Sequence, residues 1–286
     1  MVFNYTPNKV SFSQLMAYIR CPEHYLFRYV LGIKSPPRKA QVRGRAFHEA
    51  LAFYFQEKRS AKTPSLNQVQ ELYATALDLA NDEYAQELEQ AKPLLHKDYL
   101  QKEKTTNLLE LLASGLQGLS AYYKNIGPKI KPRLVEEEFE LKLNPRLKLS
   151  GRIDLIGKDG IIYETKTARV APAKLQVELD PQLAFYRLGY KNILGQYPKG
   201  YSKDYIVFGR KEAKLARFQT KRLLLDEKFV QNLATNVTRA VQQNIWYCLH
   251  PTNEWICNRE WCGYWKLHQE LRQRGLEYMV RKYRGQ

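Results

Sequence analysis

The segment GRIDLIGKDGIIYETKTAR, residues 151–169, carries the features that decide how this chain folds and where its chemistry lies. Apolar residues alternate on both sides of the turn Lys158-Asp159-Gly160, a pattern typical of two strands joined as a hairpin. Asp154 stands in the first strand among apolar neighbours, where a carboxylate is costly unless it is paired or bound to a metal. Glu164 and Lys166 are two residues apart on the second strand, so both point to one face of the sheet.

The short turn brings Asp154 beside Glu164, and two carboxylates at this range repel each other unless a divalent cation lies between them. Oxygen ligands with open coordination positions suit Mg²⁺ or Mn²⁺. Lys166 next to such a cation can orient an attacking water and stabilise charge on a phosphate. The alternative is a surface hairpin with an ordinary Glu–Lys pair, since an E-x-K triplet alone is common.

The segments around the hairpin predict an α/β fold with a mixed five-stranded sheet flanked by helices. Period-two patterns predict strands at 135–143, 147–157, 160–168, 203–209 and 213–222. Helical patterns cover 11–32 (with Ser11 or Ser13 as N-cap, a break at Pro22 and a stop near Gly32), 40–57, 66–91, 98–125, 173–194 (with a break near Pro181) and 225–246.

This order of elements predicts three regions. Residues 1–130 form a helical N-terminal region that packs on the core, and residues 131–246 form the core that holds the hairpin. Residues 247–286 form a tail rich in cysteine and tryptophan. We expect these regions to make one structural unit.

The charge of the chain points to a polyanionic partner. It has 46 Lys and Arg against 29 Asp and Glu, a net charge of +17, and this excess attracts nucleic acid. The 20 tyrosines add surfaces on which unpaired bases can stack. A generally basic, well-solvated surface is the alternative interpretation. The sequence has no apolar run long enough for a membrane helix and no secretory signal, so we expect a cytoplasmic protein without a membrane partner.

These motifs resemble the PD-(D/E)XK nuclease superfamily, whose signature is G-x-x-D followed about ten residues later by E-x-K. Here the signature reads Gly151 to Asp154 and Glu164-Thr165-Lys166. The resemblance implies a restriction-endonuclease-like core. It also implies Mg²⁺ or Mn²⁺ bound by Asp154 and Glu164 with the carbonyl of Thr165, and Lys166 as the residue that positions water.

Three further elements are similar to the RecB-like exonuclease branch of that superfamily. Q-x-x-x-Y follows on the next helix as Gln182 and Tyr186, which share a helix face and are expected to grip the substrate strand. G-x-x-x-H stands earlier as Gly44 to His48, and the resemblance implies that His48 completes the metal site. The first helix carries Ser13 and Cys21-Pro22. An acidic residue among Glu136-Glu137-Glu138, Glu138 or a neighbour, is expected to assist at the metal.

The four cysteines are Cys21, Cys248, Cys257 and Cys262, and in an intracellular chain they are free thiols or metal ligands. The resemblance implies a [4Fe–4S] cluster held by Cys21, Cys257 and Cys262, which ties the tail back to the first helix. His268 stands where the fourth cysteine is expected, and Cys248 is the alternative fourth ligand. Structural Zn²⁺ and buried thiols without any metal are the competing interpretations.

The resemblance therefore implies a deoxyribonuclease, most simply an exonuclease that acts on single-stranded DNA or DNA ends in recombination, repair or replication. Two alternatives stay open. The chain would otherwise be a DNA-binding subunit of a recombination or spacer-acquisition complex, or an endonuclease specific for DNA structure.

Overall fold

We describe the protein from a computed structural model, in which residues 5–35, 38–209, 212–221, 223–248 and 257–284 are described. The predicted tail is therefore seen without residues 249–256. The strands are β1 (Lys9–Ser11), β2 (Pro132–Asn144), β3 (Leu147–Gly157), β4 (Ile161–Ala168), β5 (Gly200–Phe208) and β6 (Ala213–Thr220).

The helices of the N-terminal half are α1 (Phe12–Arg20), α2 (Pro22–Tyr25), the π-helix η1 (Leu26–Val30), α3 (Lys39–Arg59), α4 (Leu66–Ala91), η2 (Lys92–Leu94), α5 (Lys97–Lys104), α6 (Leu108–Asn125) and η3 (Gly127–Lys129). Those of the C-terminal half are α7 (Lys174–Glu178), α8 (Pro181–Leu194), α9 (Glu227–Gln242), α10 (Trp265–Arg274) and α11 (Leu276–Arg284). No helix within the described residues is both long and apolar enough to cross a membrane.

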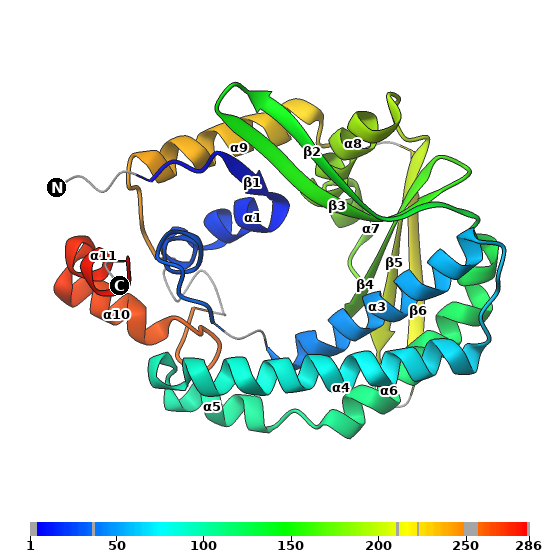
Figure 1. The fold of residues 1–286 in the computed structure, drawn as a ribbon, viewed down its shortest axis with the longest axis horizontal. Coiled ribbons are helices and arrows are strands. Elements are labelled where there is room, and N and C mark those ends of the chain that lie inside the picture. Colours follow the sequence, from blue (N-terminus) through cyan, green and yellow to red (C-terminus); the bar gives the residue numbers. More distant parts are fainter. Residues whose placement is uncertain (1–4, 36–37, 210–211, 222, 249–256, 285–286) are drawn as a thin grey trace.

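The sheet is mixed, as predicted, and the described part of the chain supplies six strands where five were expected. Its order is β1-β3-β4-β5-β6, with β2 paired to the other edge of β3 (Figure 1). The additional strand is β1, which pairs in parallel with residues 148–150 of β3. Three residues are too few to show a period-two pattern, so the sequence predicted only the helix cap at Ser11.

The pairing of β3 explains why the hairpin opens at its middle. β4 pairs with β3 only at Leu155↔Tyr163 and Ile156↔Ile162, and β1 pairs with β3 only near the start of β3. Among the described residues, the intervening residues 151–154 therefore have a strand partner in β2 alone. β4 meanwhile continues along β5 in parallel register, so β3 and β4 diverge at Asp154 and Glu164.

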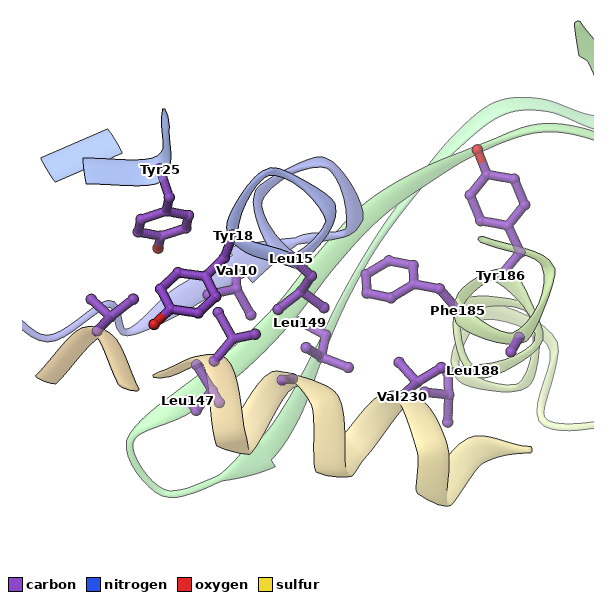
Figure 2. Packing of buried hydrophobic residues seen from close by; sticks show 14 of the residues in the cluster. Val10, Leu15, Tyr18, Tyr25, Leu147, Leu149, Phe185, Tyr186, Leu188 and Val230 are labelled. Atoms are coloured by element: carbon purple, nitrogen blue, oxygen red, sulfur yellow. The ribbon is translucent and has the colours of Figure 1, made fainter. Parts of the chain in front are cut away.

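Helices cover both faces of the sheet, and each face has its own apolar core. One core gathers residues of α1, α8 and α9 on the sheet, including Leu15, Phe185 and Val230, as Figure 2 shows. The other core gathers residues of α3, α4 and α6. Helices α3, α4 and α6 thus pack on the sheet.

Two of the predicted helical stretches are each divided into two helices, and in both cases a residue at the break explains the division. The stretch 98–125 divides into α5 and α6, because the Asn107 side chain accepts a hydrogen bond from Leu109 N (2.9 Å) and caps a new helix. The stretch 173–194 divides into α7 and α8 near Pro181, as predicted. Asp180 is the N-cap of α8, and Pro181 occupies its first turn.

Candidate active site

Three predicted or suspected metal ligands from three different elements meet at the opening between β3 and β4. His48 of α3, Glu136 of β2 and Asp154 of β3 each place one ligand atom so that the three atoms lie within 4.8 Å of one another. His48 Nδ1 lies 3.3 Å from Asp154 Oδ2. Hard carboxylate oxygens with one imidazole suit a divalent cation such as Mg²⁺ or Mn²⁺.

The backbone of Glu136 explains how this residue, rather than Glu138, reaches the site. Its pairing neighbours place Glu136 opposite Asp154, and its φ of 53° lies in the left-handed region that side chains rarely adopt. Such a conformation costs energy and persists where the surroundings demand it, often at functional sites. Sequence reasoning pointed to the acidic triplet, but only the backbone conformation distinguishes Glu136 from its neighbours.

A small cavity adjoins this group of ligands. It has a volume of about 20 Å³ and is bordered by His48, Glu136, Asp154 and Thr165 among others. A cavity of roughly 10–15 Å³ is already large enough to hold one water molecule. The predicted role of the Thr165 carbonyl stays a prediction, although the residue borders the cavity.

Glu164 and Lys166 lie beside these ligands as the hairpin predicted. The Glu164 carboxylate is completely buried, and Lys166 Nζ contacts its Oε1 as an ion pair. Apart from the contacts with Lys166 and His48, neither Glu164 oxygen nor Asp154 Oδ2 has a well-formed hydrogen bond among the described residues. Buried carboxylate oxygens left in this state are costly, so the residues present fit a bound cation.

The pKa values of the two carboxyl groups reflect how close together they lie. Burial, followed by the charge of Asp154, raises the pKa of Glu164 to about 7. Burial acts to raise the pKa of Asp154 as well, but the hydrogen bond and charge of His48 bring it below its ordinary value. Two neighbouring carboxyls thus have pKa values that are pushed apart, an arrangement typical of functional sites.

Gln182 and Tyr186 are brought to the same place by α8. Gln182 Nε2 donates a hydrogen bond of 2.9 Å to Tyr186 Oη, across one helical turn. Figure 2 shows that the Tyr186 ring leaves the apolar cluster with its hydroxyl pointing away from Phe185 and Leu188. Burial first, and then the charge of Glu164, raises the pKa of Tyr186, so this hydroxyl stays protonated.

A cleft of about 720 Å³ connects these side chains to the surface. It is lined by His48, Asp154, Lys166, Gln182 and Tyr186. Residues of β1, of the start of α1 and of the β2–β3 hairpin line it as well, among them Lys9, Ser13 and Arg152. Five of the residues predicted to act in catalysis or metal binding therefore line one open cleft.

The second predicted site gathers all four cysteines. Ligand atoms of Cys21, Cys248 and His268 lie within 4.8 Å of one another, and Cys248 Sγ lies 3.4 Å from Cys257 Sγ. Cys262 is close enough to His268 to hydrogen-bond with its imidazole. None of these four described cysteines forms a disulfide bond.

Two long-range hydrogen bonds explain why Cys248 reaches this group. Tyr18 Oη donates to the carbonyl of Ile245 (2.7 Å), and Glu23 N donates to the carbonyl of Tyr247 (3.4 Å). Both bonds bring the chain before Cys248 against α1 and α2, beside Cys21. No signal in the sequence predicts these contacts, because they join residues more than 220 positions apart.

His268 lies beside the thiols and also has partners outside this group. Its Nδ1 contacts the buried carboxylate of Glu23, and its ring packs edge-on against Phe27 at 5.0 Å. Burial acts to lower the pKa of His268, but the bonds with Cys262 and Glu23 raise it to about 9. Because its Nδ1 is already engaged by Glu23, the four thiols are the simpler donor set.

Comparison with known proteins adds to this geometry. The sequence model of the family described as the PD-(D/E)XK nuclease superfamily matches residues 9–267. No curated protein sequence matches the chain. Among solved structures, one of a proposed exonuclease from Eubacterium rectale is 10% identical, with a TM-score of 0.50, and the match covers 83% of this chain and 82% of that one. The solved structure of SSO0001 is 13% identical, with a TM-score of 0.37, and the match covers 83% of this chain and 79% of that one.

Proposed function

Because the chain belongs to the PD-(D/E)XK nuclease superfamily, we propose that it is a deoxyribonuclease dependent on Mg²⁺ or Mn²⁺. The observation that carries this proposal is the buried Glu164 with Lys166 against it, beside Asp154, which lines an open cleft together with Lys166. His48 and Glu136 complete the set of residues that would hold the cation. When bound, the cation would activate water for attack on phosphorus and stabilise the charge that develops on the phosphate.

The chain's own residues then have separate roles. Lys166 orients the attacking water and places a positive charge beside the scissile phosphate. Gln182 and Tyr186 hold the substrate strand, with the Tyr186 hydroxyl kept protonated so that it can donate a hydrogen bond. His48 orients the Asp154 carboxylate through their contact at 3.3 Å.

The substrate that we propose is DNA with a free end or in single-stranded form, in recombination, repair or replication. The net charge of +17 favours a polyanion. Assignment to the RecB-like exonuclease branch rests on His48 and the pair Gln182 and Tyr186. The exonuclease description of the similar structure from Eubacterium rectale agrees with this proposal.

The test is a Mn²⁺-dependent degradation assay on linear single-stranded DNA with the variants Asp154→Ala and Lys166→Ala. Each is expected to lower the rate by at least about 100-fold, since each removes a group that acts on the reacting phosphate. Matched controls are Glu138→Ala, an exposed carboxylate in the same cleft, and Lys174→Ala, an exposed lysine. Full activity of both active-site variants contradicts the proposal.

The same assay separates the alternatives. Binding of DNA at low salt without cleavage by any divalent metal indicates a DNA-binding subunit. Cleavage of circular single strands as fast as linear ones indicates an endonuclease.

We also propose that Cys21, Cys248, Cys257 and Cys262 hold a [4Fe–4S] cluster, with His268 hydrogen-bonded beside it. Four cysteine thiolates are the usual ligands of such a cluster, and all four thiols of this chain gather at one place. Zn²⁺ at the same thiols, or His268 in place of Cys248, are the alternatives.

Anaerobically purified protein tests this second proposal through its visible spectrum and its iron and zinc content. The Cys248→Ser variant is expected to lose the broad absorption band near 400 nm, whereas His268→Asn keeps it. The opposite result assigns the fourth position to His268, and zinc without iron replaces the cluster by a zinc site.

A further inference from the structure

Lys203 lies deep in the protein, and none of the active-site motifs assigns it a role. Only 4% of its surface is exposed, and it stands in the middle of β5. Its Nζ donates to Oδ2 of Asp180, which is itself largely buried. Lysines are rarely buried to this extent unless they are paired, so the position of this charge requires an explanation.

The carboxylate that pairs with Lys203 also begins the helix that carries the substrate-binding pair. Asp180 is the N-cap of α8, and its Oδ1 accepts a hydrogen bond of 2.8 Å from Gln182 N. Gln182 in turn donates to Tyr186 Oη at 2.9 Å. One oxygen of Asp180 is therefore bound to the helix and the other to the strand β5.

The register of the sheet places Lys203 next to the catalytic strand. β4 and β5 are parallel, and Lys203 lies directly opposite Glu164, so their side chains share a face of the sheet. Lys166 is on the same face two residues further along β4. Two lysines and two carboxylates thus lie together at the base of the cleft.

The charges in this group affect one another. Burial acts to lower the pKa of Lys166, but the charges of Glu164 and Asp154 raise it overall, and Asp180 contributes in the same direction. Burial raises the pKa of Glu164, and Lys203 is among the positive charges that moderate the rise. Asp180 is therefore within electrostatic reach of Lys166 as well as bound to Lys203.

We propose that Lys203 is a positioning residue for the reaction: by pairing with Asp180 it keeps Lys166 at Glu164 and holds the N-terminus of α8 so that Gln182 and Tyr186 face the cleft. This inference rests on the proposed nuclease function. Without Lys203, the largely buried Asp180 carboxylate keeps only the Gln182 amide as a partner and attracts Lys166 away from Glu164. A misplacement of about 1 Å is enough to slow a reaction whose groups must be aligned.

The proposal makes a specific prediction for paired variants. Lys203→Met is expected to lower kcat on the order of 100-fold because Lys166 leaves Glu164, and to raise KM because Gln182 and Tyr186 are displaced. Asp180→Asn keeps an N-cap for α8, because asparagine caps as well as aspartate, but removes the negative charge. The double variant Lys203→Met with Asp180→Asn is therefore expected to recover most of the lost kcat, and Lys203→Arg to keep more activity than Lys203→Met.

The experiment is steady-state cleavage of a linear single-stranded oligonucleotide in Mn²⁺, with rates normalised to the folded fraction measured by circular dichroism. The matched control is Lys214→Met, an exposed lysine on the neighbouring strand β6. A purely structural role for Lys203 lowers the folded fraction and leaves kcat per folded molecule unchanged, and that result overturns the proposal.

A crystal structure of the Lys203→Met variant provides a readout that does not depend on activity. Lys166 Nζ is expected to contact Asp180 in this variant, and to return to Glu164 in the double variant. If Lys166 stays at Glu164 in both, the inference is wrong even where the wild-type protein cleaves DNA. If the wild-type protein cleaves nothing but Lys166 moves as described, the proposed function fails while the positional role of Lys203 stands.

Discussion

Glu164 carries an electrostatic cost in the metal-free protein, because its carboxylate is completely buried beside Asp154. Its pKa is raised to about 7 from an ordinary value of 4.5. Between these two values the folded protein keeps the proton that the unfolded chain loses, so stability falls as the pH rises through this window. Above pH 7 the cost is fully present, and a bound cation would offset it.

We predict that Glu164→Gln stabilises the metal-free protein by about 2–3 kcal/mol at pH 8 and by much less at pH 5. The measurement is thermal or urea denaturation at both pH values in the presence of a chelator. Glu138→Gln, an exposed carboxylate of the same cleft, is the control and is expected to change stability little at either pH. An equal effect of Glu164→Gln at pH 5 and pH 8 would contradict this account.

Glu136 is the residue whose role only its backbone conformation reveals. We predict that Glu136→Gln weakens Mn²⁺ binding about tenfold or more, because it removes one charge from the group formed with His48 and Asp154. Titration calorimetry with Mn²⁺ measures the effect. Glu137→Gln, the next residue on β2, is the matched control, and equal affinities of the two variants would exclude Glu136 as a ligand.

At the scale of elements, close contact between α8 and the β2–β3 hairpin determines where Gln182 and Tyr186 lie. The Phe139 ring of β2 fits between two glycines: a Cβ on Gly189 of α8 would lie 2.4 Å from it, and a Cβ on Gly151 of β3 would lie 2.8 Å from it. Both distances are shorter than real contacts. The two glycines therefore let the helix approach the strands.

We predict that Gly189→Ala destabilises the protein by about 1–3 kcal/mol through overpacking. It is also expected to lower nuclease activity, since the displaced helix carries Tyr186. Denaturation and the DNA degradation assay measure the two effects. Asn192→Ala, at an exposed position of α8, is the control. Adding Phe139→Leu to Gly189→Ala should recover part of the stability, and no recovery would indicate that the clash is not the cause.

The sequence predicted the strands β2 to β6 and most helices, because the hydrophobic pattern of each one repeats over more than one helical turn or strand pleat. It missed β1, whose three residues are too few for a period, and it predicted no helix in the tail, where the structure has α10 and α11. It also joined α5 to α6, because the break at Asn107 depends on a single capping side chain. Short elements are stabilised by their tertiary partners, and their own sequences carry little signal.

At the scale of the whole molecule, Arg38 connects the helical region to the cysteine-rich tail. Its guanidinium donates to Glu103 (2.6 Å) and to the carbonyl of Glu260 (2.7 Å). The same group lies over the rings of Tyr99 (4.1 Å) and Trp261 (4.7 Å). Arg38 and Glu260 are 222 residues apart in the chain. Figure 1 shows that α5 and the segment before α10 lie side by side, and Arg259 pairs with Asp98 there at 2.6 Å.

We predict that Arg38→Met destabilises the protein by about 3–5 kcal/mol, because it leaves the buried Glu103 without its cation. Arg45→Met is the matched control: its pair with Glu83 has the same 2.5–2.6 Å separation but is exposed, so the expected cost is under about 1 kcal/mol. Urea denaturation of both variants measures the difference. Similar losses in the two variants would mean that burial does not determine the strength of these pairs.

The sequence by itself determined the elements and the residues of the catalytic hairpin. Asp154, Glu164 and Lys166 are separated by a short turn, so local geometry alone places them together, and Gln182 and Tyr186 share a helix face for the same kind of reason. Only the tertiary structure selected Glu136 within its triplet, brought Cys248 to Cys21, and paired Lys203 with Asp180. These contacts depend on strand register, on a residue with positive φ and on hydrogen bonds across more than 200 residues. Periodicity in a sequence records which face a residue lies on, but it does not record which distant residue that face will meet.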